Sequence, residues 1–192
     1  MATLASKAEQ QKTDLIARAA ALAKTRLGDA RAPEVAEFVH VLYANVAPDD
    51  LAGDSAENLY AAALSLWSFG GQRKPGAAKV RVYNPRPDEH GWISHHTIIE
   101  MVNDDMPFLV DSLTAALHRR DLTVHLVIHP ILQVKRDKAG NRSTEGTAFT
   151  ESFMQIRINE QSSADRLKEI GSEISAVLAD VRAAVEDWQK MK

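Results

Sequence analysis

The run IEMVNDDMPFLVDSL, residues 99–113, decides the fold because its apolar pattern changes period in the middle. Residues 93–103 alternate in the manner of a β-strand, whereas the apolar residues after Phe108 recur at helical spacing. Asp105 is a suitable N-cap for that helix. The run therefore predicts a strand, a tight turn and a helix over about 106–120.

Two more strands and a long helix are predicted downstream. Within residues 122–136 the even positions form one face that must meet a core, and Pro130 indicates an edge or a bulge there. The apolar residues of this face are Leu122, Val124, Leu126, Ile128, Leu132 and Val134. Residues 137–142 contain Gly140-Asn141 and reverse the chain into a strand over about 149–159. A single helix follows over 162–190. Its apolar residues recur at a heptad-like spacing: Ile170, Ile174, Val177, Val181, Ala184 and Trp188.

The order from residue 93 onward is strand, helix, strand, strand, helix, which is the ferredoxin-like plan without its last strand. Residues 79–83 also read as a short strand. Either the chain stops before the last strand, or residues 79–83 fill its place from the other end. The long final helix packs on this sheet, or its far end docks on later sequence or on another subunit.

The amino-terminal part of the chain is predicted to be helical. One helix has Pro33 in its first turn, and the next begins at Asp54, which forms a capping box with Glu57. Two adjacent glycines and Pro75-Gly76 mark a linker. The predicted organisation is a helical domain over 1–70, a linker over 71–78 and an α+β domain over 79–192, an antiparallel sheet with helices on one face.

Composition excludes several classes of function. The 192 residues carry a formal net charge of −3 with both signs interspersed, which is unlike a nucleic-acid-binding protein. There is no cysteine, so disulfides and thiolate metal sites are absent and a cytoplasmic location is expected. No apolar run is long enough for a signal peptide or a membrane span, so neither nucleic acid nor membrane is expected as a partner.

The sequence also argues against chemistry in this chain. His125 and His129 lie about 13 Å apart on a strand, at ~3.3 Å per residue, and His95 and His96 point to opposite faces, so no metal site is predicted. None of the nine glycines forms G-x-G-x-x-G after a strand, which excludes the dinucleotide-binding turn. No catalytic, cofactor-binding or metal-binding residue is predicted.

The turn after the first strand resembles the ACT domain pattern, in which Asp, any residue, Pro, Gly and two aliphatic residues open a helix and amino acids bind at the turn. Here the pattern reads DMPFLV over 105–110. More closely, the chain resembles the amino-terminal region of the large NAD-specific glutamate dehydrogenases. The matching segments are residues 99–112, Arg119-Arg120 and LTVHLVIHP over 122–130, and more weakly Phe69-Gly70, RVYNP over 81–85 and ESFMQI over 151–156.

That resemblance implies an ACT-like regulatory and assembly module belonging to a much longer enzyme of amino-acid metabolism. In the family, a later domain oxidatively deaminates glutamate to 2-oxoglutarate with NAD, so NAD is a cofactor of the parent and not of this chain. The implied partners are the remainder of the parent chain and further subunits of an oligomer. The alternatives are a free-standing amino-acid-sensing ACT domain and a purely structural interaction domain.

Any amino-acid effector is expected at the turn formed by Asn103, Asp104, Asp105, Met106 and Phe108. The carboxylates of Asp104, Asp105 and Asp111 are more simply interpreted as helix caps that oppose the helix dipole. Two features disfavour an effector: the acidic residues would repel an anion, and Phe108 stands where ACT binders have Gly, filling the space that a ligand needs.

Overall fold

The computed structural model describes residues 4–191 and divides into two compact units. The first contains the chain up to Phe69 together with Pro85–Ser94, and the second contains Gly70–Asn84 together with the chain from His95 onward. Helices and a five-stranded antiparallel sheet confirm the α+β class. Within residues 4–191, no helix combines the length and the hydropathy that crossing a membrane requires.

The first unit is helical, as predicted. It contains α1 (Leu4–Arg26), α2 (Ala32–Tyr43), α3 (Pro48–Leu51), α4 (Ala56–Phe69) and α5 (Pro87–His90). α1, α2 and α4 pack on one another, and the Tyr43 hydroxyl donates to the Leu59 carbonyl over 3.0 Å. The predicted cap of α4 was wrong by one residue: the Ser55 hydroxyl accepts from the Asn58 amide nitrogen, while Asp54 accepts from the Asn58 side chain.

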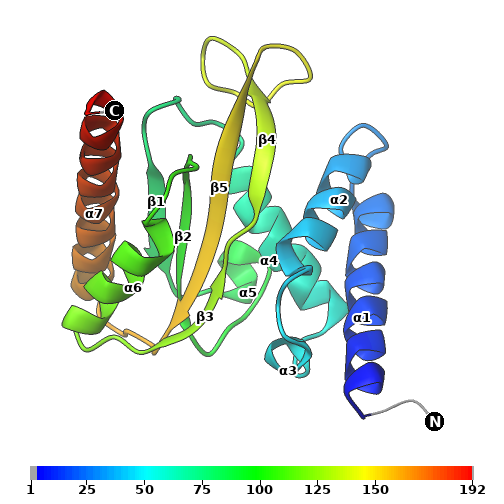
Figure 1. Ribbon diagram of the computed structural model, residues 1–192. Helices are drawn as coiled ribbons and strands as arrows, with labels where there is room; N and C mark the ends of the chain where they lie inside the picture. Colours follow the sequence, from blue (N-terminus) through cyan, green and yellow to red (C-terminus); the bar gives the residue numbers. More distant parts are fainter. Residues whose placement is uncertain (1–3, 192) are drawn as a thin grey trace. The chain divides into compact units, whose positions relative to one another are not determined.

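The second unit is built on one sheet of β1 (Lys79–Tyr83), β2 (Thr97–Asp104), β3 (Val124–Ile128), β4 (Ile131–Arg136) and β5 (Thr147–Ile158) (Figure 1). β1 pairs with β2 and β2 pairs with β5, whose other edge pairs first with β4 and then with β3. All of these pairings are antiparallel. β3 and β4 therefore act as one broken edge strand, interrupted at His129 and Pro130.

The short strand β1 supplies the strand that the ferredoxin-like plan was missing. Its register on β2 runs from Lys79 opposite Val102 to Tyr83 opposite Ile98, which is the place of the last strand in a ferredoxin-like sheet. Of the two possibilities left open by the sequence, residues 79–83 filling the vacancy is the correct one. The plan is thus complete, with its last strand moved to the front of the chain.

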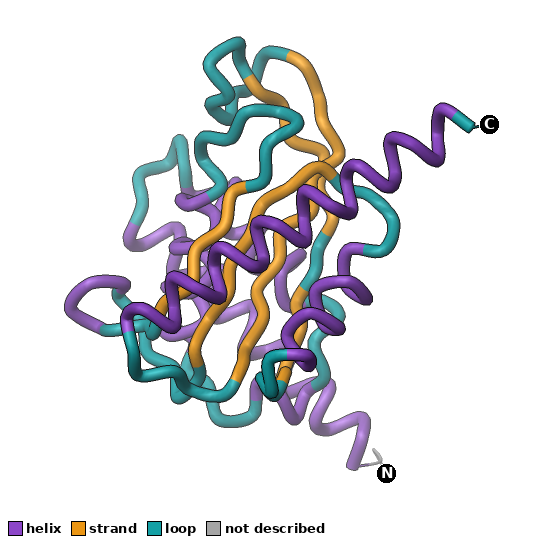
Figure 2. The backbone as a smooth tube through the Cα atoms, turned by 90° about the vertical axis from the view of Figure 1, so that its left-hand side faces the viewer, coloured by secondary structure: helices purple, strands orange, loops and turns teal. Residues whose placement is uncertain are grey.

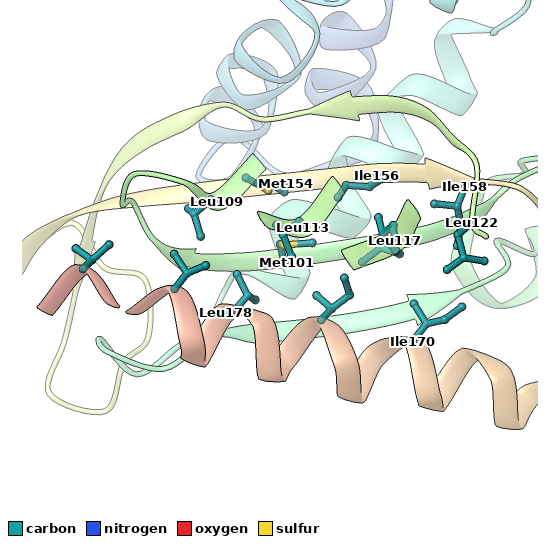
Figure 3. Packing of buried hydrophobic residues seen from close by; sticks show 14 residues of the cluster. Met101, Leu109, Leu113, Leu117, Leu122, Met154, Ile156, Ile158, Ile170 and Leu178 are labelled. Atoms are coloured by element: carbon teal, nitrogen blue, oxygen red, sulfur yellow. The ribbon is translucent and has the colours of Figure 1, made fainter. Parts of the chain in front are cut away.

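Two helices cover one face of this sheet, α6 (Leu109–Arg119) and α7 (Ala164–Lys190), and α7 extends past the strands at its C-terminal end (Figure 2). The core between helices and sheet is apolar: Figure 3 shows Met101, Met154 and Ile156 from the strands facing Ile170 and Leu178 from α7. The α7 residues buried there are Ile170, Ile174, Leu178, Val181 and Val185. The predicted seam is therefore correct only in part, because Ala184 and Trp188 are exposed.

A β-bulge corrects the prediction that the even positions of 122–136 share one face. The pairing with β5 shifts between Val124 and Leu126. Val124 and Val127 consequently pack on the helix side, whereas Leu126 pairs with Arg157 on the other face of the sheet. An extra residue in one strand reverses the alternation of side chains beyond it, so the even positions change faces at this point.

Candidate functional site

The predicted effector turn joins β2 to α6, and its backbone differs from the prediction. α6 begins at Leu109, and its N-cap residue is Phe108, which makes no side-chain cap and has φ 68° and ψ 4°. The prediction that Asp105 caps a helix starting near residue 106 was therefore wrong. The left-handed region costs a residue with a side chain roughly 1–2 kcal/mol relative to a right-handed conformation. Phe108 therefore adopts a backbone conformation that favours Gly, the residue that the ACT pattern has at this position.

The Phe108 side chain points outward. Its exposed fraction is 63%, which contradicts the expectation that the ring fills a ligand space inside the turn. The ring instead lines a groove of about 550 Å³ between α6 and α7. Met106 is half-buried and packs against the apolar core, so the turn is anchored by Met106 and not by its aromatic neighbour.

Asn103 lies at the buried end of the turn, with an exposed fraction of 1%. Its Oδ1 accepts from Arg182 Nη2 of α7 over 3.0 Å. Its Nδ2 has no hydrogen-bond partner among residues 4–191. A buried donor without an acceptor destabilises the fold by about 1–3 kcal/mol.

Asp104 is held by two arginines. Its carboxylate accepts from Arg73 Nη2 over 2.6 Å, from Arg182 Nη2 over 2.7 Å and from the Gly76 backbone nitrogen over 2.8 Å. Burial acts to raise the pKa of Asp104, but the hydrogen bond and charge of Arg73, with help from Arg182, outweigh it and hold the pKa below its ordinary value. Asp104 is therefore an ion-pair residue and not a helix cap. Its charge is neutralised by these two arginines.

Asp105 belongs to a short polar chain with Ser152 and His129. The Ser152 hydroxyl donates to Asp105 Oδ1 over 2.8 Å and lies 2.8 Å from His129 Nε2. Burial lowers the pKa of His129, and the Asp105 carboxylate opposes this only in part. Because the hydroxyl proton goes to Asp105, His129 must donate to the serine oxygen. A histidine in that role cannot remove the serine proton, so these three residues do not form a catalytic triad.

A buried ion network adjoins the turn and was not predicted from the sequence. Glu151 is fully buried; its Oε1 accepts from Arg73 Nη2 over 2.7 Å and from Arg136 Nε over 2.6 Å. Arg136 Nη2 donates to Glu151 Oε2 over 2.7 Å. The sequence did contain a signal for this network. Arg136 lies at the next even position after the apolar residues of its strand, and a charged side chain on a buried face requires a partner.

Histidines do not gather into a metal centre. Among residues 4–191, no group of three or more His, Cys, Asp or Glu side chains is placed to hold an ion. The structure does bring together His96 and His125, whose rings stack with centroids 4.5 Å apart. Burial first, and then the charges of His125, Arg157 and His95, lower the pKa of His96.

Comparisons with known proteins agree with this architecture. Residues 38–174 match the model of the family described as glutamate dehydrogenase, ACT1 domain. An NAD-specific glutamate dehydrogenase of Halomonas elongata is 39% identical over 191 residues, which is 96% of this chain and 12% of that protein. One of Pseudomonas aeruginosa is 33% identical over 173 residues, 86% of this chain and 11% of that protein. The chain thus spans about an eighth of the length of the relatives it matches.

Proposed function

Because this chain belongs to the glutamate dehydrogenase ACT1 domain family, we propose that it is a non-catalytic regulatory and assembly module of an NAD-specific glutamate dehydrogenase. The parent enzyme would oxidatively deaminate L-glutamate to 2-oxoglutarate with NAD as its cofactor. Its remaining domains would carry the chemistry, and the cytoplasm is the proposed location, which fits a chain without cysteine.

The architecture of the second unit is the observation that carries this proposal. Dinucleotides bind at the carboxyl ends of parallel strands next to a Gly-rich turn, whereas every strand pairing here is antiparallel. The two carboxylates of the turn are engaged with residues from elsewhere in the second unit: Asp104 with two arginines, and Asp105 with Ser152. Such groups position a backbone turn and leave no activated nucleophile or general base at it.

The non-catalytic assignment is tested by calorimetry and by assay of the 192-residue chain. We expect no saturable heat on titration with NAD and no glutamate-dependent formation of NADH, while a full-length relative assayed in parallel is active. Saturable NAD binding by the chain alone would sink the proposal.

We further propose that the regulatory ligand of this turn is an amino-acid effector. The unpartnered Nδ2 of Asn103 is a donor for a ligand carboxylate, and Arg182, about a quarter exposed at 24%, is a cation beside it. Asp105 offers carboxylate oxygens to an ammonium group. A free α-amino acid carries both complementary charges, so this amide favours a sensing role over a purely structural one.

The effector assignment is tested separately by chemical-shift mapping with arginine, aspartate and glutamate. We expect shifts centred on residues 103–109 for one of these ligands, and at least a tenfold weaker interaction for Asn103→Ala. Gln133→Ala, on the exposed side of β4, is the matched control and should bind normally. The absence of shifts with all three amino acids would leave the module a purely structural one.

A further inference from the structure

Four basic side chains gather at one end of the sheet of the second unit, where β2 and β3 begin and β5 ends (Figure 1). Thr97 at the start of β2 and Val124 at the start of β3 both lie opposite Ile158, the last residue of β5. This end of β2 is opposite to the end that carries the predicted effector turn. The basic residues are His95 and His96 before β2, His125 in β3 and Arg157 in β5.

A β-bulge brings His125 onto His96. The pairing of β3 with β5 shifts between Val124 and Leu126, so His125 is the extra residue of the bulge. Its ring stacks on that of His96, with the centroids 4.5 Å apart and 25° between the ring planes. Bulges re-aim side chains and are frequent beside functional sites. His125 is exposed and His96 and Arg157 are half-buried, so solvent reaches the cluster.

The electrostatic surroundings of His96 are basic throughout the described part of the chain. Burial lowers its pKa most, followed by the charges of His125, Arg157 and His95, and no carboxylate opposes them. Protonation of the stacked pair beside an arginine therefore weakens the fold. An uncharged aromatic pair would stack equally well without this cost, so stability alone does not account for two histidines here. A bound anion would reverse the cost, because it stabilises the protonated rings.

We propose that His96, His125 and Arg157 bind the dianionic group of inorganic phosphate or of a phosphate monoester. The guanidinium group of arginine matches phosphate oxygens with two parallel donors, and a protonated imidazole adds a charged donor. A phosphate monoester carries a charge of about −1.5 to −2 at pH 7. The two linked phosphates of NAD carry only one charge each, so NAD is not expected to bind here. The proposal is independent of the glutamate dehydrogenase assignment.

A divalent metal ion is the other ligand that a pair of histidines can hold. The charge of Arg157 beside the rings disfavours a cation. Among residues 4–191, no group of three or more His, Cys, Asp or Glu side chains is placed around an ion. The surroundings therefore favour the anion, and zinc is a control ligand in its test.

The first experiment follows the histidine ring signals of the 192-residue chain by NMR, at constant ionic strength in chloride. We expect inorganic phosphate and glycerol phosphate each to shift the rings of His96 and His125 saturably. Equal affinities would identify the free phosphate group as sufficient, and tighter binding of glycerol phosphate would identify an organic monoester as the ligand. The pKa of His96 should be higher with saturating phosphate than in chloride, because the anion favours the protonated ring.

The second experiment compares variants. His125→Phe keeps a stacking ring and removes both ring nitrogens, so we expect at least tenfold weaker phosphate binding with a melting temperature that stays level or rises. Arg157→Gln should weaken binding to a similar degree, and its melting temperature shows whether it is folded. His118→Gln, which replaces an exposed histidine in the last turn of α6, is the matched control and should bind normally.

The absence of saturable shifts up to millimolar phosphate would overturn this proposal. Shifts of equal affinity in His125→Phe would overturn it as well, because phosphate would then bind elsewhere on the chain. If zinc shifts the two rings at lower concentrations than phosphate does, the stacked pair is a metal site and the assignment of an anion is wrong.

Discussion

At the scale of single residues, the buried carboxylate of Glu151 is the centre of the ion network with Arg73 and Arg136. It is fully buried and accepts three hydrogen bonds from Arg73 and Arg136. We expect Glu151→Gln to lower the free energy of unfolding by about 3–5 kcal/mol, because Arg136 then loses its buried counter-charge and Arg73 keeps only Asp104. Urea denaturation measures this.

Glu169→Gln is the control for that measurement. Glu169 pairs with Arg166 on the exposed side of α7 over 3.2 Å, and an exposed pair of this kind contributes less than about 1 kcal/mol. Equal losses for the two variants would show that burial does not set the importance of the Glu151 network.

The lowered pKa values of His96 and His129 predict an acid-sensitive fold. A histidine whose folded pKa lies below its unfolded value near about 6.5 binds fewer protons in the native state. Its contribution to stability is therefore present at neutral pH and decreases as the pH falls from about 7 toward the folded pKa. We expect the melting temperature to drop over this window, and to drop less in His129→Gln, whose amide still donates to Ser152. A slope unchanged by that substitution would exclude His129 as a source.

At the scale of elements, the bulge in β3 changes which substitutions are severe. Leu126 lies beyond the bulge and is only partly buried, so we expect Leu126→Asp to lower the free energy of unfolding by about 1–3 kcal/mol. Leu113→Asp, at a fully buried position of α6, should prevent folding because an unpaired charge enters the core. Denaturation of both variants compares them. A Leu126 variant as damaging as the Leu113 variant would mean that Leu126 faces the helices.

Elements defined by local patterns were predictable, whereas features set by distant partners were not. Apolar periodicity predicts the bounds of β1 and the helices α2 and α7. Pro33 in the first turn of α2 is a further signal for that helix. The bulge in β3 depends on how this strand pairs with β5, and the left-handed backbone of Phe108 depends on the geometry of the turn. The sequence of one segment does not specify either. The turn was located correctly, but its partners Arg73, Arg182 and Ser152 lie between about thirty and eighty residues away along the chain.

At the scale of the whole molecule, residues 70–78 are fixed to the second unit although their composition predicts a linker. The Arg73 nitrogen donates to the Gly140 carbonyl over 2.9 Å, and the Arg142 nitrogen donates to the Gly71 carbonyl over 2.8 Å. A β-carbon on Gly70 would lie 2.4 Å from the Phe153 ring. These contacts join the segment to the β4–β5 hairpin.

Limited digestion with trypsin tests this attachment. The segment contains one bond that trypsin would cut, after Arg73, since Lys74 precedes a proline. We expect early cleavage after exposed Lys138 at the hairpin tip and not after Arg73, whose side chain is buried. Mass spectrometry of the intact products identifies the site. Early appearance of a fragment ending at Arg73 would show that the segment opens independently of the sheet.

The position of β1 at the front of the ferredoxin-like order also determines how the sheet can grow during synthesis. In the usual ferredoxin-like order, the last strand to be synthesised is a neighbour of the first strand in the sheet. One edge of that first, central strand therefore stays unpaired until the end of synthesis. Here β1 emerges before β2, and the two pair across a separation of only 15 to 23 residues. β3 and β4 have no partner until β5, the last strand to be made, pairs with β2 on one edge and with β3 and β4 on the other. Early local pairing of this kind shortens the time for which strand edges are exposed to aggregation.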